Sequence, residues 1–242
     1  MKNNLIIIST IMFLNWILIA IYCRIERFID ERKFKRESTM SVQSNLNDNE
    51  EEISVVKQLY YWGNSYFYGW VRFNVLVLGY FPSYRIRKIF YRAVFGMKLT
   101  RKTVIFGKCE FRSPWNISIG NSTISANCIL DGRGKIDIGN DVVLGSGVHI
   151  WTEEHSINDP YFRVLKENIQ PVIIKRHAWV CSDTTILPGI TIKEGAVLAS
   201  RACAVKDCEA YKIYGGIPAK IIGERNRDLR YELSGKVSWH FM

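Results

Sequence analysis

The sequence predicts an all-β solenoid, a left-handed parallel β-helix of hexapeptide repeats, preceded by helices and a transmembrane anchor. Three observations predict it. Aliphatic residues stand six apart from residue 174 to residue 204, a period that fits neither a strand nor a helix. A run of 19 residues without charge lies near the N-terminus, and an aromatic and then basic stretch separates it from the repeats.

The six-residue spacing defines the coils of the β-helix. Small or β-branched residues stand four positions after each of the first five aliphatic residues, so both sets share one register. Three hexads make one triangular coil of about 18 residues, with the aliphatic residue inside and the small residue at a turn. The aliphatic positions are Ile174, Val180, Ile186, Ile192, Leu198 and Ala204, and upstream Ile138, Leu144 and Ile150. Ordinary strands of a β-sandwich are the alternative, which a strict period of six disfavours.

The repeat domain, with its C-terminal extension, is expected to span residues 104–242. Within it, "DGRGK" at residues 131–135 predicts a turn with an inserted residue. Residues 151–170 are too long for a hexad turn and predict an outward loop. After residue 204 we expect a terminal strand, a "GGIPAK" loop and a short C-terminal helix, because a repeat fold ends in an atypical unit.

The N-terminal segment predicts a membrane anchor. Residues 5–23 carry no charge and are long enough to cross a bilayer as a helix. Cations cluster directly after them, so the positive-inside rule places the rest of the chain on the cytoplasmic face. Residues 1–36 are therefore interpreted as an anchor with a basic juxtamembrane segment, and the acidic residues 37–55 as a flexible linker. A buried core helix is the alternative.

Residues 56–103 predict an aromatic and basic helical cap. Ten aromatic residues lie between residues 56 and 81, and residues 82–109 contain no acid. Such a stretch can bind single-stranded nucleic acid by stacking, or lie on a membrane with its cations against anionic lipid. The anchor upstream favours the membrane, so we expect no nucleic-acid partner. Helices here also fit a cover for the open end of the solenoid.

The loop at residues 151–170 contains the candidate catalytic residue, His155. An imidazole suits the removal of a proton from a hydroxyl near neutral pH, although an isolated loop histidine is more often an ordinary surface residue. The six cysteines show no metal-ligand spacing and fit reduced, buried thiols of a cytosolic environment. We therefore expect no metal.

Longer motifs carry a family resemblance. "HAWVCSDTTILPGITIKEGAVLASRACAVKD" followed by "GGIPAK" resembles the hexapeptide-repeat sugar O-acetyltransferases, which include the galactoside and maltose acetyltransferases. "PSYRIRKIFYRAVFG" and "PWNISIGN" are more similar to the acetyltransferases of colanic-acid and exopolysaccharide biosynthesis. The resemblance covers about residues 80–225, so the anchor and the linker lie outside it.

The resemblance implies roles for five residues. His155 stands at the position of the family's general base, and Asn127 at that of an acceptor-binding asparagine. Trp179 and Ser182 match residues that line the acceptor and pantetheine channel near the thioester. Lys220, in "GGIPAK", matches the segment beside the phosphates of coenzyme A. The implied reaction is acetyl transfer from acetyl-CoA to a hydroxyl of a sugar or lipid-linked glycan, in a homotrimer whose sites lie between chains.

Two departures and two rivals qualify this interpretation. The family's usual glycine after "VWI" is Cys181 here, and its short "GHP" loop is replaced by "EHSINDPYF", so acceptor specificity does not transfer. A γ-type carbonic anhydrase shares the fold but requires three histidines around zinc, a spacing that His149, His155 and His177 do not match. A non-catalytic trimeric membrane scaffold is the other alternative, and it would not require His155, Trp179 and Ser182.

Overall fold

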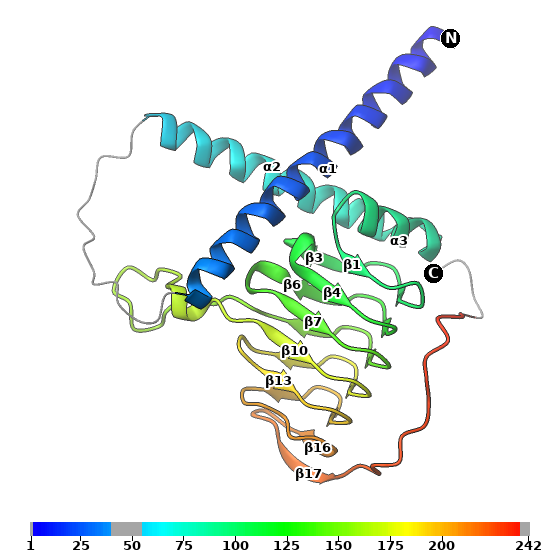
Figure 1. The fold of residues 1–242 in the computed structure, drawn as a ribbon, viewed down its shortest axis with the longest axis vertical. Coiled ribbons are helices and arrows are strands. Elements are labelled where there is room, and N and C mark those ends of the chain that lie inside the picture. Colours follow the sequence, from blue (N-terminus) through cyan, green and yellow to red (C-terminus); the bar gives the residue numbers. More distant parts are fainter. Residues whose placement is uncertain (1, 40–54, 238–242) are drawn as a thin grey trace.

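The structure, a computed structural model, describes residues 2–39 and 55–237. Three helices precede a stack of short strands that wind into a tapering prism (Figure 1). The helices are α1 (Lys2–Thr39), α2 (Val55–Gly79) and α3 (Tyr84–Ala93). Most of the acidic linker expected at residues 37–55 lies outside the described residues.

The prism is a parallel β-solenoid with three faces, as the six-residue period predicts. Successive strands along the chain fall on successive faces, so each face is a sheet of strands that come from consecutive coils. The first sheet contains β1 (Lys98–Leu99), β4 (Ile117–Ile119), β7 (Ile136–Ile138), β10 (Val172–Ile174) and β13 (Thr191–Ile192).

The other two sheets complete the prism. The second contains β2 (Val104–Ile105), β5 (Thr123–Ile124), β8 (Val143–Leu144), β11 (Trp179–Val180), β14 (Val197–Leu198), β16 (Lys212–Gly215) and β17 (Lys220–Glu224). The third contains β3 (Glu110–Arg112), β6 (Ile129–Asp131), β9 (His149–Ile150), β12 (Thr185–Ile186) and β15 (Cys203–Ala204). All strand pairs in the prism are parallel except the terminal β16–β17 pair.

The hexad residues form the core of the prism. Ile186, Ile192 and Leu198 are completely buried, and the backbone register stacks each hexad on the same position of the previous coil, so that Ile192 lies beside Ile174 and Leu198 beside Val180. Burial of one such side chain stabilises the fold by about 1.5–3 kcal/mol. A continuous aliphatic column therefore replaces the two-layer core of an ordinary domain.

One-turn 3-10 helices mark the corner between the third and first sheets. η1 (Pro114–Asn116) follows β3, and η2 (Gly132–Gly134) follows β6, where the sequence predicts a turn with an inserted residue. Gly132 is required there, because a Cβ on it would lie 2.7 Å from the Ser113 carbonyl oxygen of the preceding coil. The outward loop between β9 and β10, which ends in η3 (Lys166–Asn168), leaves from the same corner.

Helices α2 and α3 cover the first coils. Tyr91 and Phe95 of the α3 region are completely buried, and the Tyr91 ring meets the Phe111 ring of β3 edge-on at 5.0 Å. Arg87 is also fully buried, and its guanidinium donates to the backbone carbonyls of Phe81 and Ile105. Carbonyl groups at this end of the solenoid thus gain the donors that no preceding coil supplies.

The second half of α1 packs on the cap and the solenoid. The Asp30 carboxylate accepts hydrogen bonds from Trp115 Nε1 at 2.8 Å and Asn116 Nδ2 at 2.7 Å, and Ile19 and Cys23 are 2% and 1% exposed. Side chains of the predicted segment 1–36 thus contact the cap and the first coils. Within the described chain, α1 alone is long and apolar enough to cross a membrane, between Ser9 and Phe34, and 11% of this apolar segment is buried.

The predicted C-terminal helix is wrong within the described residues. β16 and β17 form an antiparallel hairpin, and residues 225–237 then run back along the prism as an extended strand-like segment (Figure 1). Its backbone bonds to the solenoid turns: Leu233 N donates to Asp141 Oδ1 at 2.8 Å, and the Tyr231 carbonyl bonds His177 Nε2 at 3.0 Å. Tertiary contacts thus override a weak local helix preference.

Candidate active site

The site is centred on the long loop between β9 and β10. The base of this loop is closed like a hairpin, because Gln170 N donates to the Thr152 carbonyl at 2.9 Å and Glu154 N to the Asn168 carbonyl at 3.2 Å. A bridge between Glu153 and Ile169 lies between them. His155 directly follows this paired stem. Strand β9 and the hydrogen-bonded stem therefore fix the position of the His155 backbone, from which the imidazole extends.

The imidazole of His155 has a defined tautomer. Its Nδ1 lies 2.7 Å from the Phe162 carbonyl oxygen, and because a carbonyl only accepts, Nδ1 carries the proton. In the neutral imidazole, Nε2 is then the acceptor nitrogen. The Phe162 ring stacks on the imidazole with centroids 4.4 Å apart and planes 2° from parallel. The side chain is exposed; the imidazole is therefore accessible to solvent and held in one orientation.

Asp159 holds the part of the loop that bonds His155. Its carboxylate accepts from Arg163 N and Arg163 Nε, each at 2.8 Å, and its backbone carbonyl accepts from Phe162 N at 2.9 Å. These bonds keep Phe162 at φ 51°, a conformation that an aromatic residue rarely adopts. The bond to Arg163 holds the pKa of Asp159 at about 2. The strained turn is thus maintained by an ionised carboxylate.

With His155 as the base that the resemblance implies, we expect Asp159→Asn to lower kcat about 10-fold, because a misplacement of about 1 Å at a reacting group costs up to about 10²-fold. The ionised Asp159 carboxylate stabilises the loop fully when the pH is above the pKa of an Asp in the unfolded chain, near 3.9. This stabilisation is lost as the pH falls through the folded-state pKa of about 2. The loss in the variant should therefore be the same at pH 6 and pH 8.

Steady-state rates at both pH values measure this effect. Asp207→Asn is the matched control, because Asp207 likewise accepts a backbone N–H, that of Thr191, but in a turn of the following coils. A wild-type kcat for Asp159→Asn, or an equal loss in the control, would contradict the proposed role of the carboxylate.

A cavity of about 460 Å³ adjoins the base of the loop. It lies between α1, α2, the corner turns of the first coils and the loop itself, and its lining includes Tyr22, Tyr68, Trp115, Arg133, Glu153 and Lys166. The loop that carries His155 and the helix that could enter a membrane thus border the same space.

The other predicted site residues lie at different edges of the prism. Asn127 follows β5 and Ser182 follows β11, so both lie at the corner between the second and third sheets. Trp179 is on β11 with 46% of its surface exposed, and Lys220 begins β17 and is exposed. The loop of His155 leaves from the corner between the third and first sheets. A single chain therefore does not bring His155 together with these four residues.

Cys181 occupies the turn between Trp179 and Ser182 and is half-buried. Burial raises the pKa of its thiol, so the thiol is a weak nucleophile. The opposing Gly145 allows the close approach of this turn, because a Cβ there would lie 2.5 Å from Ser182 N. The two coils can approach closely at this turn because the residue of the previous coil is a glycine, although residue 181 is a cysteine.

The remaining histidines do not join His155. His149 pairs in sheet register with Thr185 and Ile129 on the third face, whereas His177 bonds the C-terminal segment at Tyr231. In residues 2–39 and 55–237, no three His, Cys, Asp or Glu side chains are grouped so as to hold a metal.

Sequence reasoning missed the residues that orient His155. The contribution of Phe162 is a backbone carbonyl, which every residue has, so no pattern of side chains could identify it. Asp159 had a signal, because it stands in "NDP", a turn sequence whose carboxylate commonly bonds its own backbone. Arg133 and Asp131 stand in the predicted turn but were not connected with the loop.

Comparison with known proteins identifies relatives over nearly two thirds of the chain. No family model matches the chain. The Escherichia coli K12 protein named "Putative colanic acid biosynthesis acetyltransferase WcaF" is 27% identical over 159 residues, which cover 64% of this chain and 85% of that protein. A solved maltose O-acetyltransferase of Clostridium difficile is 25% identical with a TM-score of 0.55, covering 64% of this chain and 87% of that one.

A further solved structure shows the same fold. It is a hexapeptide-repeat-containing acetyltransferase of Vibrio cholerae, complexed with acetyl coenzyme A, with a TM-score of 0.57 at 23% identity over 63% of this chain and 83% of that chain. The relatives match across most of their own length, from 83% to 87%. The chain is therefore similar in sequence and in fold to acetyltransferases of the hexapeptide-repeat kind, as its sequence motifs predict.

Proposed function

We propose that this chain is an O-acetyltransferase that moves an acetyl group from acetyl-CoA to a hydroxyl of a sugar in a polysaccharide precursor, with His155 as the general base. The observation that carries this proposal is the hydrogen bond from His155 Nδ1 to the Phe162 carbonyl. In the neutral imidazole it leaves Nε2 as the acceptor on an exposed, oriented ring, which is what removal of a hydroxyl proton requires.

The chemistry needs only one proton transfer in each direction. A thioester is already activated, so the protein contributes mainly the placement of two substrates. His155 Nε2 takes the proton from the sugar hydroxyl as the hydroxyl oxygen attacks the thioester carbonyl. The same nitrogen then returns the proton to the departing thiolate sulfur. A backbone N–H or the Ser182 hydroxyl stabilises the oxyanion formed between these steps.

A complete site in this proposal needs a second chain. His155 lies at one corner of the prism, and Ser182, Asn127 and Trp179 lie at another corner and its adjoining face, so they can meet only across an interface between copies. A homotrimer of parallel prisms supplies such an interface three times. Exposed apolar side chains favour contact there: Trp179, and in the terminal hairpin Ile217, Ile221 and Ile222, are 46–78% exposed.

The coenzyme is proposed to bind beside the second sheet. Trp179 and Ser182 would flank the pantetheine arm and the thioester, with Asn127 near the sugar at the same corner. Lys220, exposed at the start of β17, would pair with a phosphate of the coenzyme, for which an ammonium group is well suited. The solved relative of Vibrio cholerae is complexed with acetyl coenzyme A, which supports this choice of acetyl donor.

The acceptor class follows from the relatives and from the N-terminal helices. Two of the relatives are named for colanic acid biosynthesis and maltose, so a sugar hydroxyl is proposed here. α1 and the loop of His155 border one cavity, which would keep a membrane-bound acceptor close to the base. A lipid-linked glycan is therefore the proposed natural acceptor.

The proposed location is the cytoplasmic face of a membrane, with α1 as a single-pass anchor. The first half of α1 projects away from the prism (Figure 1), and its exposed residues include Ile11, Phe13, Leu14 and Leu18, each 51–67% exposed. α2 adds exposed aromatic residues that suit the headgroup region; Tyr60, Tyr61, Trp62 and Tyr66 are 58–73% exposed. An apolar groove of about 490 Å³ between the two helices continues this surface.

We expect the full chain to remain in the membrane pellet after an alkaline carbonate wash, and the double variant Ile11→Lys, Leu14→Arg to be released. Charges near the centre of a spanning helix cost about 2.5–3.5 kcal/mol each on insertion scales. Ile157→Lys is the matched control, because Ile157 is 87% exposed but lies in the loop of the solenoid. Recovery of the wild type in the soluble fraction would overturn the anchor.

Substitutions are a cleaner test than removal of residues 1–36. That deletion would also strip Ile19 and Cys23 from the core and Asp30 from Trp115, so a change of location could not be separated from a loss of stability. The reaction itself is tested with radiolabelled acetyl-CoA and saccharide acceptors, comparing the wild type with His155→Ala. Incorporation of label by the wild type alone is the expected result.

A further inference from the structure

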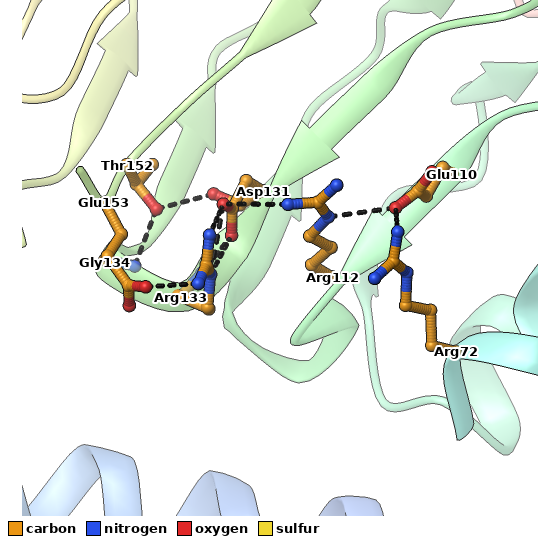
Figure 2. A network of polar contacts seen from close by, with 8 residues as sticks. All are labelled: Arg72, Glu110, Arg112, Asp131, Arg133, Gly134, Thr152 and Glu153. Carbon is orange, nitrogen blue, oxygen red and sulfur yellow. Dashed lines mark hydrogen bonds and ion pairs between the residues drawn. The ribbon is translucent and has the colours of Figure 1, made fainter. Parts of the chain in front are cut away.

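A line of alternating charges connects α2 with the stem of the catalytic loop (Figure 2). Positive and negative side chains alternate along the third face, and each contacts the next: Arg72, Glu110, Arg112, Asp131, Arg133 and Glu153. Arg72 belongs to α2, the next three to β3 and β6, and Arg133 to η2. Glu153 is the second residue after Trp151 and stands two positions before His155.

The strongest part of this line is its centre. The Asp131 side chain is completely buried, and its oxygens lie 2.9 and 3.1 Å from Arg133 Nε. Arg112 Nη1 is 3.9 Å away on the other side. The hydrogen bonds that Arg133 donates to the Asp131 carboxylate raise the pKa of Arg133 above its usual value. Arg133 is therefore fixed in place, and its Nη1 is left to bond the Glu153 carboxylate.

The same corner bonds the stem a second time. Thr152 Oγ1 accepts from Gly134 N at 2.7 Å and donates to the Asp131 carbonyl at 2.6 Å, and Thr152 is fully buried. Thr152 and Glu153 are consecutive, and both are tied to η2 in the coil below. These two residues of the loop stem thus take their position from that coil and not from the loop itself.

The solenoid does not need these charges to close the corner. The equivalent corner after β12 is the uncharged sequence Leu187–Ile190, and it turns without an ion pair. Buried ion pairs give little net stability, because desolvation offsets their attraction, but they can select one arrangement among several. The charged residues occur in the coils next to the loop. There they can favour one position of the long insertion relative to the solenoid.

We propose that Arg133 and Glu153 are positioning residues of the acetyltransferase: the buried Asp131–Arg133 pair holds Glu153, and through it the loop stem, so that His155 is presented in one place. The proposal rests on the proposed role of His155 as the base. Neither residue takes part in the proton transfer. Arg72 is half-exposed, so solvent screens its pair with Glu110, and that end of the line contributes little.

The decisive variant is Glu153→Ala, because it frees the stem while Asp131 keeps Arg133 as its partner and no buried charge is left alone. We expect kcat to fall about 10-fold, as for a small displacement of a reacting group, with KM for acetyl-CoA within about 2-fold of the wild type. Glu153→Gln, which keeps an acceptor oxygen without the charge, should lie between the two. Arg133→Gln should lower kcat at least as much, although it leaves Asp131 with Arg112 alone.

Hydrogen exchange of the full chain supplies a readout that does not depend on catalysis. In Glu153→Ala, the amides of Glu154 and Ser156, which bond Asn168 and Arg163 across the loop, should exchange about 10-fold faster, while β12 amides stay protected. Asp228→Ala is the matched control, since it removes a carboxylate from an exposed ion pair with Arg230. Neither kcat nor loop exchange should change in the control.

The outcomes separate this proposal from the proposed function. Unchanged loop exchange and unchanged kcat in Glu153→Ala overturn the positioning role, and so does a loss of kcat that Glu153→Gln fails to recover in part. If His155→Ala kept full activity, the proposed base would be wrong, and the exchange rates alone would still decide whether Glu153 holds the loop.

Discussion

Replacement of His155 by alanine is expected to lower kcat by about 10²–10⁴-fold, the usual contribution of a general base. The imidazole is exposed. Within the described residues its hydrogen-bond partner is the Phe162 carbonyl, which Nδ1 contacts. Removal of the imidazole therefore leaves no buried group without a partner. Binding of acetyl-CoA should remain close to that of the wild type, because the coenzyme is proposed to contact Trp179, Ser182 and Lys220.

Steady-state kinetics and a thermal melt of the same preparation separate chemistry from folding. Activity within a few-fold of the wild type would exclude His155 as the base. Mixed trimers extend the test, since in the proposed homotrimer a His155→Ala chain and a Trp179→Ala chain would each be defective in a different half of the proposed shared site. Recovery of activity on mixing is expected, and its absence in verified heterotrimers would count against sites formed between chains.

Truncation of Ile186 to alanine is expected to lower the free energy of unfolding by about 2–5 kcal/mol, because it removes a buried side chain and leaves a cavity that a rigid core fills poorly. Ile186 is completely buried and lies in register between Ile150 and Ala204 of the adjacent coils. The parallel strands on both sides fix its backbone, so the coil has little freedom to collapse into the space.

Denaturant unfolding in detergent measures this loss. Ile157→Ala is the matched control: it removes the same atoms from a side chain that is 87% exposed, and surface changes of this kind usually remain within about 0.5 kcal/mol. A loss below about 1 kcal/mol for Ile186→Ala would mean that the hexad position is not a core position. Equal losses in both variants would point to a general effect of the substitution.

The solenoid was predictable because its rule is local and repeats. Every hexad encodes one strand and one turn, so the register of Ile174, Val180 and Ile186 could be counted without knowledge of which strands pair. The outward loop was predictable for the same reason, because the six-residue period is interrupted there. The C-terminal segment was not predictable. The path of residues 225–237 depends on hydrogen bonds with Asp141 and His177, and a charged sequence with weak helix preference does not indicate those partners.

For the candidate site, the sequence by itself determined that a hexad solenoid carries a long insertion with His155 at its start. It also determined, by resemblance, the candidates Trp179, Ser182, Asn127 and Lys220. Only the tertiary structure decided how His155 is held, because the Phe162 carbonyl becomes its partner only when the chain reverses at Asp159. It alone also decided that Arg133 meets Glu153, since these residues are 20 positions apart and become neighbours through the stacking of coils. A period in the sequence specifies positions along a coil, whereas contacts between an insertion and the coil below arise only after both have folded.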